Sequence, residues 1–265
     1  EDAGKKSEEA GGRFSKMAEL AKGAGSAIAT GVKVIGAGVA ALGAAMVAGI
    51  GYATKVADDA KGAMNDFTAK TEHAFLSAGQ SVAGFDAVLK NIYAGNYGES
   101  FADIGEAMAT VVQNAKDLDP ANIEQLTTDA LILRDAFGFE VQESMRAANM
   151  LMDQFGLSGK EAFNLIAQGA QSGLDKNGDL LDSINEYSVH YKQLGLDAEE
   201  MFNSLYAGAQ EGAFSVDKVG DAIKEFGIRV KDGSATTNEA FAALGLNAAE
   251  MQAAFSQGGD AAADA

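Results

Sequence analysis

The chain has 265 residues, with one Pro, no Cys and no Trp, and a formal net charge of −18. The absence of Cys excludes a disulfide framework, a thiolate metal site and a thiol nucleophile. Abundant Ala, Glu, Lys, Leu and Met with almost no Pro favour helices. We therefore expect an all-α protein that forms one large or two small domains.

The charge is divided unevenly along the chain. Residues 1–64 contain eight Lys and Arg against seven Asp and Glu, a net charge of +1. Residues 65–265 contain twelve against thirty-one, a net charge of −19. Phosphate binding requires clustered Lys and Arg that displace counterions, so we expect no direct binding to nucleic acid. We divide the chain here into an N-terminal helical region, residues 1–64, and an acidic helical domain, residues 65–265.

Residues 34–54 form a run of 21 residues without a charge. About 20 apolar residues cross a bilayer as a helix, and small residues at every fourth position let helix backbones approach closely. The sequence therefore predicts a membrane-competent helix that self-associates. The alternative is a buried helix of a soluble bundle, because only seven of the 21 residues are Val, Ile, Leu or Met. The two faces of this helix are defined by Val34, Ile35, Gly36, Ala40, Leu42, Ala44, Met46, Ala48 and Ile50.

From residue 65 onward, apolar residues recur at helical spacing in short stripes, which begin at Val141, Leu180 and Val219. A junction also recurs, in which Gly is followed by a large apolar residue and, five positions after the Gly, by Glu. The Gly suits the left-handed residue that ends a helix. In three cases a Ser, Asp or Asn completes a predicted capping box with the Glu. The junctions pair Gly138 with Glu143, Gly156 with Glu161, Gly195 with Glu200 and Gly245 with Glu250.

Two further helix starts are predicted, one at Asp119 followed by Pro120 and one at Thr236 with Glu239. The junction glycines are 18, 39 and 50 residues apart, which indicates a repeated turn and not a solenoid of fixed period. We expect a compact domain of about eight to ten short amphipathic helices. As one helix the chain would reach about 400 Å, but the junctions exclude this, so the segment is not itself a ruler of length.

One cluster of polar residues partly matches a calcium-binding loop. Position 6 of that template requires Gly, where this chain has Leu180, so we interpret the segment as a helix-capping turn. The two histidines are 117 positions apart and have no metal-ligand spacing. We expect no catalytic activity, cofactor or metal. The residues that match the template are Asp175, Asn177, Asp179, Ser183 and Glu186.

Four runs of sequence resemble the tail tape measure proteins of long-tailed bacteriophages and related prophages. They cover residues 130–147, 164–173, 173–202 and 214–234, and the resemblance extends from about residue 65 to the C-terminus. It implies a segment of a longer protein that lies in the lumen of the tail tube. Proteins of that family set the length of the tail, leave it ahead of the DNA and help to open the host membrane.

The resemblance also implies partners and locations. The implied partners are the tail tube protein, tail assembly chaperones, the host membrane and further copies of the chain in the tail lumen. The implied locations are the virion, the host cytoplasm during assembly and the host cell membrane on ejection. The alternative is a pore-forming protein, in which the small-residue helix inserts into a membrane and the helical domain is the soluble body.

Overall fold

The computed structural model describes the backbone of residues 39–213 and 215–265, and side chains from residue 54 onward with the exception of residue 214. Within these residues the chain contains helices and no strand, which confirms the predicted all-α class. The helices are α2 (Val39–Ser77), α3 (Phe85–Ala94), α4 (Phe101–Asn114), α5 (Pro120–Phe137), α6 (Val141–Phe155), α7 (Gly159–Gln171), α8 (Leu180–Gln193), α9 (Ala198–Gln210), α10 (Val216–Arg229), α11 (Ala235–Ala243), α12 (Ala248–Gln257) and α13 (Asp260–Ala263).

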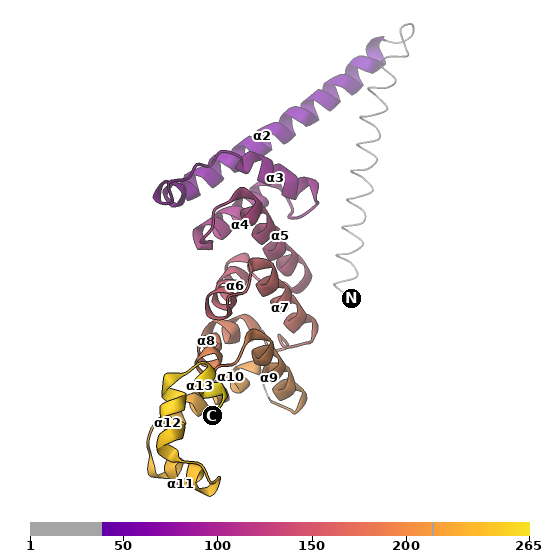
Figure 1. Cartoon of the computed structure of the whole chain (residues 1–265). Helices are drawn as coiled ribbons and strands as arrows, with labels where there is room; N and C mark the ends of the chain where they lie inside the picture. The colour runs from indigo at the N-terminus through magenta and orange to yellow at the C-terminus, as the bar shows by residue number, and fades with distance from the viewer. Residues whose placement is uncertain (1–38, 214) are drawn as a thin grey trace.

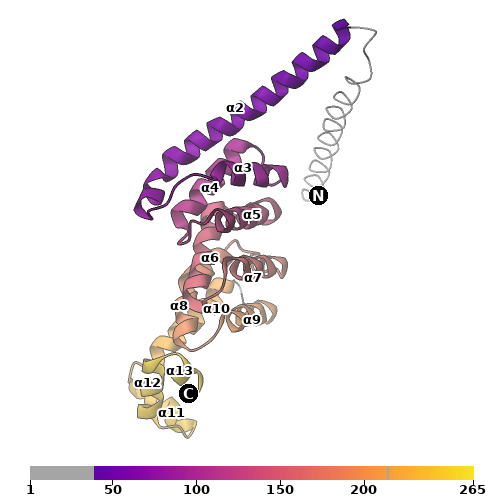
Figure 2. The ribbon, with the colours of Figure 1, turned by 45° about the horizontal axis from the view of Figure 1, so that its top comes forward.

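The helices form two layers that alternate along the chain (Figures 1 and 2). The even-numbered helices from α2 to α10 pack on one another in chain order, and the odd-numbered helices from α3 to α9 form the second layer. Such an arrangement is an α-solenoid, in which each repeat contacts its neighbours. The buried residues accordingly form a strip between the layers, which runs from Ala60 in α2 to Val216 in α10.

Corresponding helices begin at nearly constant intervals. Helices α5, α7 and α9 begin at residues 120, 159 and 198, which are 39 apart, and α4, α6 and α8 begin at 101, 141 and 180. The prediction that no fixed period exists was therefore wrong. That prediction compared glycines at the ends of helices that do not correspond to one another. Gly138 follows α5 and Gly245 follows α11. Gly156 and Gly195 follow the corresponding helices α6 and α8, and these two glycines are 39 residues apart.

The repeat is also visible in the sequence of the odd-numbered layer. Residues 161–173 and 200–212 are identical at seven of thirteen positions. Several of these identities are explained by the fold, since Phe163 and Phe202 are both buried. A Cβ on Gly169 or Gly208 would lie 2.8 Å or 2.4 Å from a neighbouring side chain, so these helices pack closely at glycine. The shared residues are Glu161 and Glu200, Phe163 and Phe202, Asn164 and Asn203, Gly169 and Gly208, Ala170 and Ala209, Gln171 and Gln210, and Gly173 and Gly212.

Helix α2 crosses the proposed boundary between residues 64 and 65. Ala60 and Ala63 on one side of it and Phe67 and Phe75 on the other are buried, and α2 packs against α4. A Cβ on Gly105 of α4 would lie 3.3 Å from the Ala63 carbonyl oxygen, so the two backbones approach closely. The first part of α2 projects beyond the stack (Figure 1). The charge division at residue 64 therefore falls inside a helix that the solenoid already contacts.

The predicted membrane segment is only partly described. Val34, Ile35 and Gly36 lie outside the described residues. Of α2 before residue 54, only the backbone is described. In the described part of the chain, no helix is both long enough and apolar enough to cross a membrane. The remaining residues assigned to this segment, which all lie on α2, are Ala40, Leu42, Ala44, Met46, Ala48 and Ile50.

The junction glycines adopt the left-handed conformation, with φ of 78° at Gly138, 73° at Gly156, 79° at Gly195 and 76° at Gly245. Two of the junctions contain complete capping boxes, formed by Ser158 with Glu161 and by Asp197 with Glu200. In the last junction the side chain of Asn247 accepts hydrogen bonds from the backbone of α12 and donates one to the Glu250 carboxylate at 3.0 Å.

One predicted capping box is wrong, and one junction has no side-chain cap, as none was predicted there. Glu143 does not cap α6; it accepts a hydrogen bond from Arg146 at 2.8 Å, and the residue before α6 makes no side-chain cap. The predicted capping box of Thr236 and Glu239 was wrong, because the helix begins earlier and is capped by Ser234, which accepts from the Thr237 amide. The start at Asp119 and Pro120 is confirmed.

The two layers are joined by a bidentate ion pair between α5 and α4. Arg134 donates to both carboxylate oxygens of Asp103 at 2.7 Å and 3.0 Å, and the Glu99 amide donates to the same carboxylate at 2.8 Å. Burial acts to raise the pKa of Asp103, but these hydrogen bonds and the charge of Arg134 outweigh it, so the pKa lies below its ordinary value. Both side chains are about three quarters buried.

We predict that Asp103→Asn lowers the free energy of unfolding near pH 7 by about 1.5–3 kcal/mol, the range for hydrogen bonds to charged groups. A carboxylate with a lowered folded-state pKa contributes its stability above the unfolded-state pKa, about 3.9. That stability is lost as the pH falls through the folded-state value. Urea denaturation of both proteins between pH 7 and pH 2.5 should therefore show a difference that shrinks below about pH 4. If the difference in the free energy of unfolding between the two proteins stayed constant with pH, the ionised carboxylate of Asp103 would not be its cause.

Candidate interaction surface

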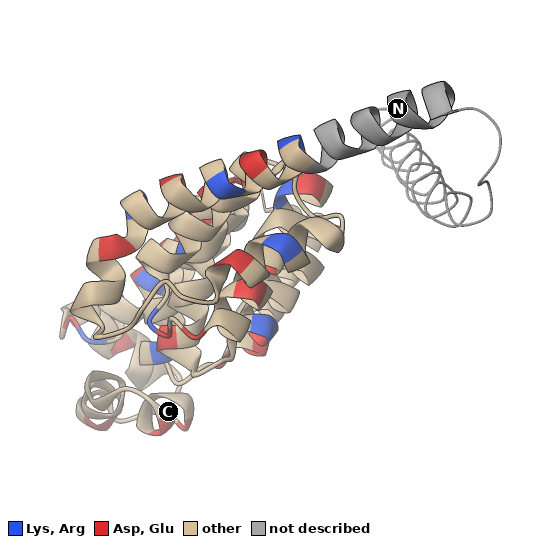
Figure 3. Cartoon of the chain, turned by 90° about the horizontal axis from the view of Figure 1, so that it is seen from above, with Lys and Arg blue, Asp and Glu red and all other residues tan. Residues whose placement is uncertain are grey.

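Positions occupied by charged residues are distributed over the described part of the solenoid (Figure 3). Most ion pairs have exposed partners, such as Lys55 with Asp59 and Lys90 with Asp86, and pairs of this kind contribute about 0–1 kcal/mol each. Acidic residues outnumber basic ones by thirty-one to twelve in residues 65–265. Residues 65–265 therefore carry a net charge of −19.

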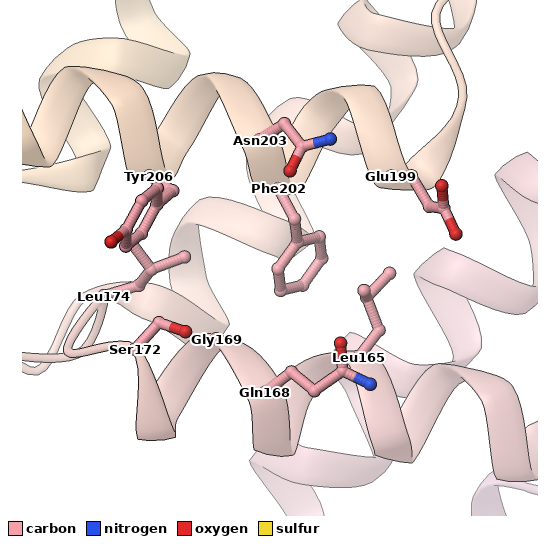
Figure 4. Close-up of a pocket in the computed structure, with 9 residues that line it drawn as sticks. All are labelled: Leu165, Gln168, Gly169, Ser172, Leu174, Glu199, Phe202, Asn203 and Tyr206. Atoms are coloured by element: carbon pink, nitrogen blue, oxygen red, sulfur yellow. The ribbon is translucent and has the colours of Figure 1, made fainter.

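A groove lies between α7 and α9 in the odd-numbered layer (Figure 4). Leu165 and Gln168 line it from α7, and Phe202, Asn203 and Tyr206 line it from α9, with the ring of Phe202 directed into the space between the helices. The groove has a volume of about 280 Å³. The remaining residues that line it are Glu199 of α9 and Gly169, Ser172 and Leu174 of α7 and the segment that follows it.

The local sequence positions residues in the walls of this groove. Gly169 removes a side chain where α7 meets Phe202, and the capping box at Asp197 fixes the start of α9, so Glu199 lies in its first turn. The groove is slightly smaller than the roughly 300–1,000 Å³ of small-molecule sites. Among the described residues it offers two carboxamides, two hydroxyls, one of them the phenol of Tyr206, and the carboxylate of Glu199, which lies at the opposite end of the groove from Tyr206. Its chemistry is therefore that of a side-chain binding groove.

A second, more apolar groove of about 670 Å³ lies at the N-terminal end of the solenoid. It is formed by α2, α3 and the start of α4. Among the described side chains that line it, the charged ones are Lys61, Asp86 and Lys90, and Lys90 forms an ion pair with Asp86. The apolar residues that line it are Val56, Ala57, Ala60, Met64 and Phe101.

The calcium-like segment caps α8, as the sequence analysis proposed. Asp175 accepts a hydrogen bond at 3.0 Å from the amide of Leu180, the first residue of α8. The carboxylate of Asp179 makes no cap to α8 and instead accepts a hydrogen bond at 3.3 Å from the Asp217 amide of α10. Burial raises the pKa of Asp175, with the neighbouring charge of Asp179 adding to the effect. Among the described side chains, no group of three or more His, Asp or Glu is arranged to hold a metal ion.

We predict that millimolar calcium leaves the melting temperature of the full chain unchanged. The carboxylate of Asp175 already accepts the Leu180 amide, and the template glycine is missing at Leu180. Differential scanning fluorimetry with calcium, and with magnesium as the control for ionic strength, measures this. A calcium-specific rise in melting temperature would contradict the capping interpretation, because a ligand that binds only the folded state stabilises it.

Two features of the surface were missed by the sequence analysis. The first is the groove between α7 and α9, whose walls come from helices that start 39 residues apart. The second is a set of exposed apolar side chains near the C-terminal end of the stack, including Phe226 and Leu244, which is 73% exposed. The equal spacing of the Val141 and Leu180 stripes and of Gly156 and Gly195 was the signal that could have revealed the repeat.

Comparison with known proteins identifies the class of this solenoid. Residues 91–264, about two thirds of the chain, match the family described as "Phage-related minor tail protein", so the chain belongs to that family of bacteriophage tail proteins. It is also similar to the "Probable tape measure protein" of Streptomyces phage phiC31, with 35% identity over 71 residues. The match covers 27% of this chain and 9% of that protein. No solved structure matches this chain.

Proposed function

We propose that this chain is a segment of a tail tape measure protein that lies in the lumen of the tail tube. Membership of the phage minor tail protein family carries this proposal, and the similarity to a probable tape measure protein supports it. An elongated two-layer stack is a shape that suits a tube (Figure 2). Family membership also favours this role over the alternative of a secreted pore-forming protein.

In this proposal the segment assists tail assembly as a folded unit, and other parts of the parent protein determine length. One repeat of 39 residues would span about 58 Å as a single helix. Within the solenoid it adds about one interhelical distance, 8–10 Å. The tail tube protein and tail assembly chaperones would be its partners, and further copies of the chain would lie beside it in the lumen.

The acidic composition supports a role in which the protein does not bind the phage DNA. A net charge of −19 over residues 65–265 repels DNA at low salt, which would let the protein leave the tube ahead of the DNA without binding it. For the membrane step, the charge-free run at residues 34–54 supports insertion into the host membrane on ejection. Flotation of the full chain with liposomes tests that step, and recovery only in the soluble fraction would contradict it.

The lumenal location is tested in intact virions. The chain contains no Cys, so a single cysteine with a photoactivatable cross-linker can be placed at exposed Tyr206, with Glu211 as a second exposed site. We expect cross-links to the tail tube protein before ejection and their loss after ejection is triggered. Cross-links only to baseplate proteins, or none to the tube in intact tails, would contradict the proposal.

A further inference from the structure

We compare the helix pair α5 and α7 with the next pair, α7 and α9, at two positions whose charge differs between the pairs. In α5, burial raises the pKa of Asp129, while a hydrogen bond from Gln125 and the charge of Lys160 in α7 act to lower it; Asp129 and Lys160 form no direct ion pair among the described side chains. The corresponding residues 39 positions later are Gln168 and Glu199. Lys160 in the first turn of α7 is thus replaced by Glu199 in the first turn of α9, and Glu199 forms no ion pair with any described residue.

The same two repeats share exposed carboxamides that the fold does not require. Asn203 repeats Asn164, and Gln210 repeats Gln171. All four are exposed, and none makes a side-chain hydrogen bond to a described residue. A carboxamide both donates and accepts hydrogen bonds, as a peptide group does. Asn203 lines the groove between α7 and α9, beside the buried Phe202 (Figure 4).

The groove is suited to an extended chain. Glu199 and Tyr206 lie at its two ends, seven residues apart on α9, which corresponds to about 10.5 Å along a helix. Three residues of extended chain cover about 10 Å.

We propose that the groove between α7 and α9 binds an extended segment of a partner polypeptide that carries a basic residue and, two positions later, an aliphatic one. The basic side chain pairs with Glu199, where the preceding repeat has its own lysine. The aliphatic side chain lies on the same face of the extended chain and contacts Phe202 and Leu165. Asn203 pairs with the peptide group between them. This binding does not depend on whether the chain acts inside the tail tube.

The test uses the full chain and two fluorescent peptides, Gly-Ser-Arg-Ser-Leu-Ser-Gly and the same peptide with Glu in place of Arg. By fluorescence polarisation at low salt, we expect the Arg peptide to bind the wild type at least tenfold more tightly than the Glu peptide. Glu199→Lys should reverse this preference. The fold tolerates Lys here, since Lys160 occupies the corresponding position of α7.

Glu211→Lys is the matched control, because it makes the same charge change at the exposed C-terminal end of α9, away from the groove. It should retain the preference for the Arg peptide. The absence of saturable binding of the Arg peptide up to about 1 mM, a dissociation constant worth about 4 kcal/mol, would overturn the proposal. So would equal effects of the two substitutions, because these would show general attraction to an acidic surface.

Discussion

Gly220→Ala should lower the free energy of unfolding by about 2–4 kcal/mol. A Cβ at this position of α10 would lie 2.0 Å from Cδ2 of Tyr187, whose side chain is buried in α8 and 2% exposed. Overpacking of this kind costs about 1–3 kcal/mol. Displacement of the ring would also weaken the 2.8 Å hydrogen bond from the Tyr187 hydroxyl to the Asp217 carboxylate, a class worth about 1.5–3 kcal/mol. The helix propensity of Ala offsets up to about 1 kcal/mol of this.

Gly227→Ala in the same helix is the control for Gly220→Ala. The nearest atoms to a Cβ there belong to Leu194 at 3.8 Å, which is ordinary van der Waals contact. Ala should therefore stabilise the helix by up to about 1 kcal/mol relative to Gly. Urea denaturation followed by circular dichroism compares the two variants. If both variants shift the midpoint in the same direction, the close contact between α8 and α10 does not exist as described.

Gly195→Ala is the second substitution expected to have a large effect, about 2–4 kcal/mol. Gly195 has a φ of 79°, and a residue with a Cβ in this conformation costs about 1–2 kcal/mol. In addition, the new Cβ would lie 2.3 Å from the Gly259 carbonyl oxygen and 2.7 Å from Cβ of Ala263. The segment that contains α13 would have to move away from the junction, at a further cost of about 1–3 kcal/mol.

Gly156→Ala separates these two contributions. Gly156 has a similar φ of 73°, but no atom of the described residues lies within 4 Å of an added Cβ. Its cost should be limited to the backbone strain of about 1–2 kcal/mol. Hydrogen exchange provides the second measurement: the Gly259 amide, which donates to the Gln193 carbonyl at 3.2 Å, should lose protection in Gly195→Ala and keep it in Gly156→Ala. Equal protection in both variants would contradict the contact with the C-terminal segment.

The sequence by itself determined the helical class and the positions where helices end. Helix ends depend on local interactions, and Ser158 with Glu161 or the left-handed Gly195 can be recognised because the interacting groups lie within a few residues. The same locality explains the error at Thr236 and Glu239. Both Ser234 and Thr236 are residue types that can cap this helix, and in the structure the N-cap is Ser234.

Only the tertiary structure decided how the helices are layered and where a groove is left. An apolar stripe specifies that a helix face is buried but not which helix covers it. The stripe from Val219 shows this limit, since Phe226 is 49% exposed although its spacing predicted burial. Likewise, Glu199 and Leu165 are separated by a whole helix in sequence and share one groove only because α7 and α9 are neighbours in the odd-numbered layer. Contacts between residues far apart in the chain depend on packing across the layers, and local propensity carries no information about them.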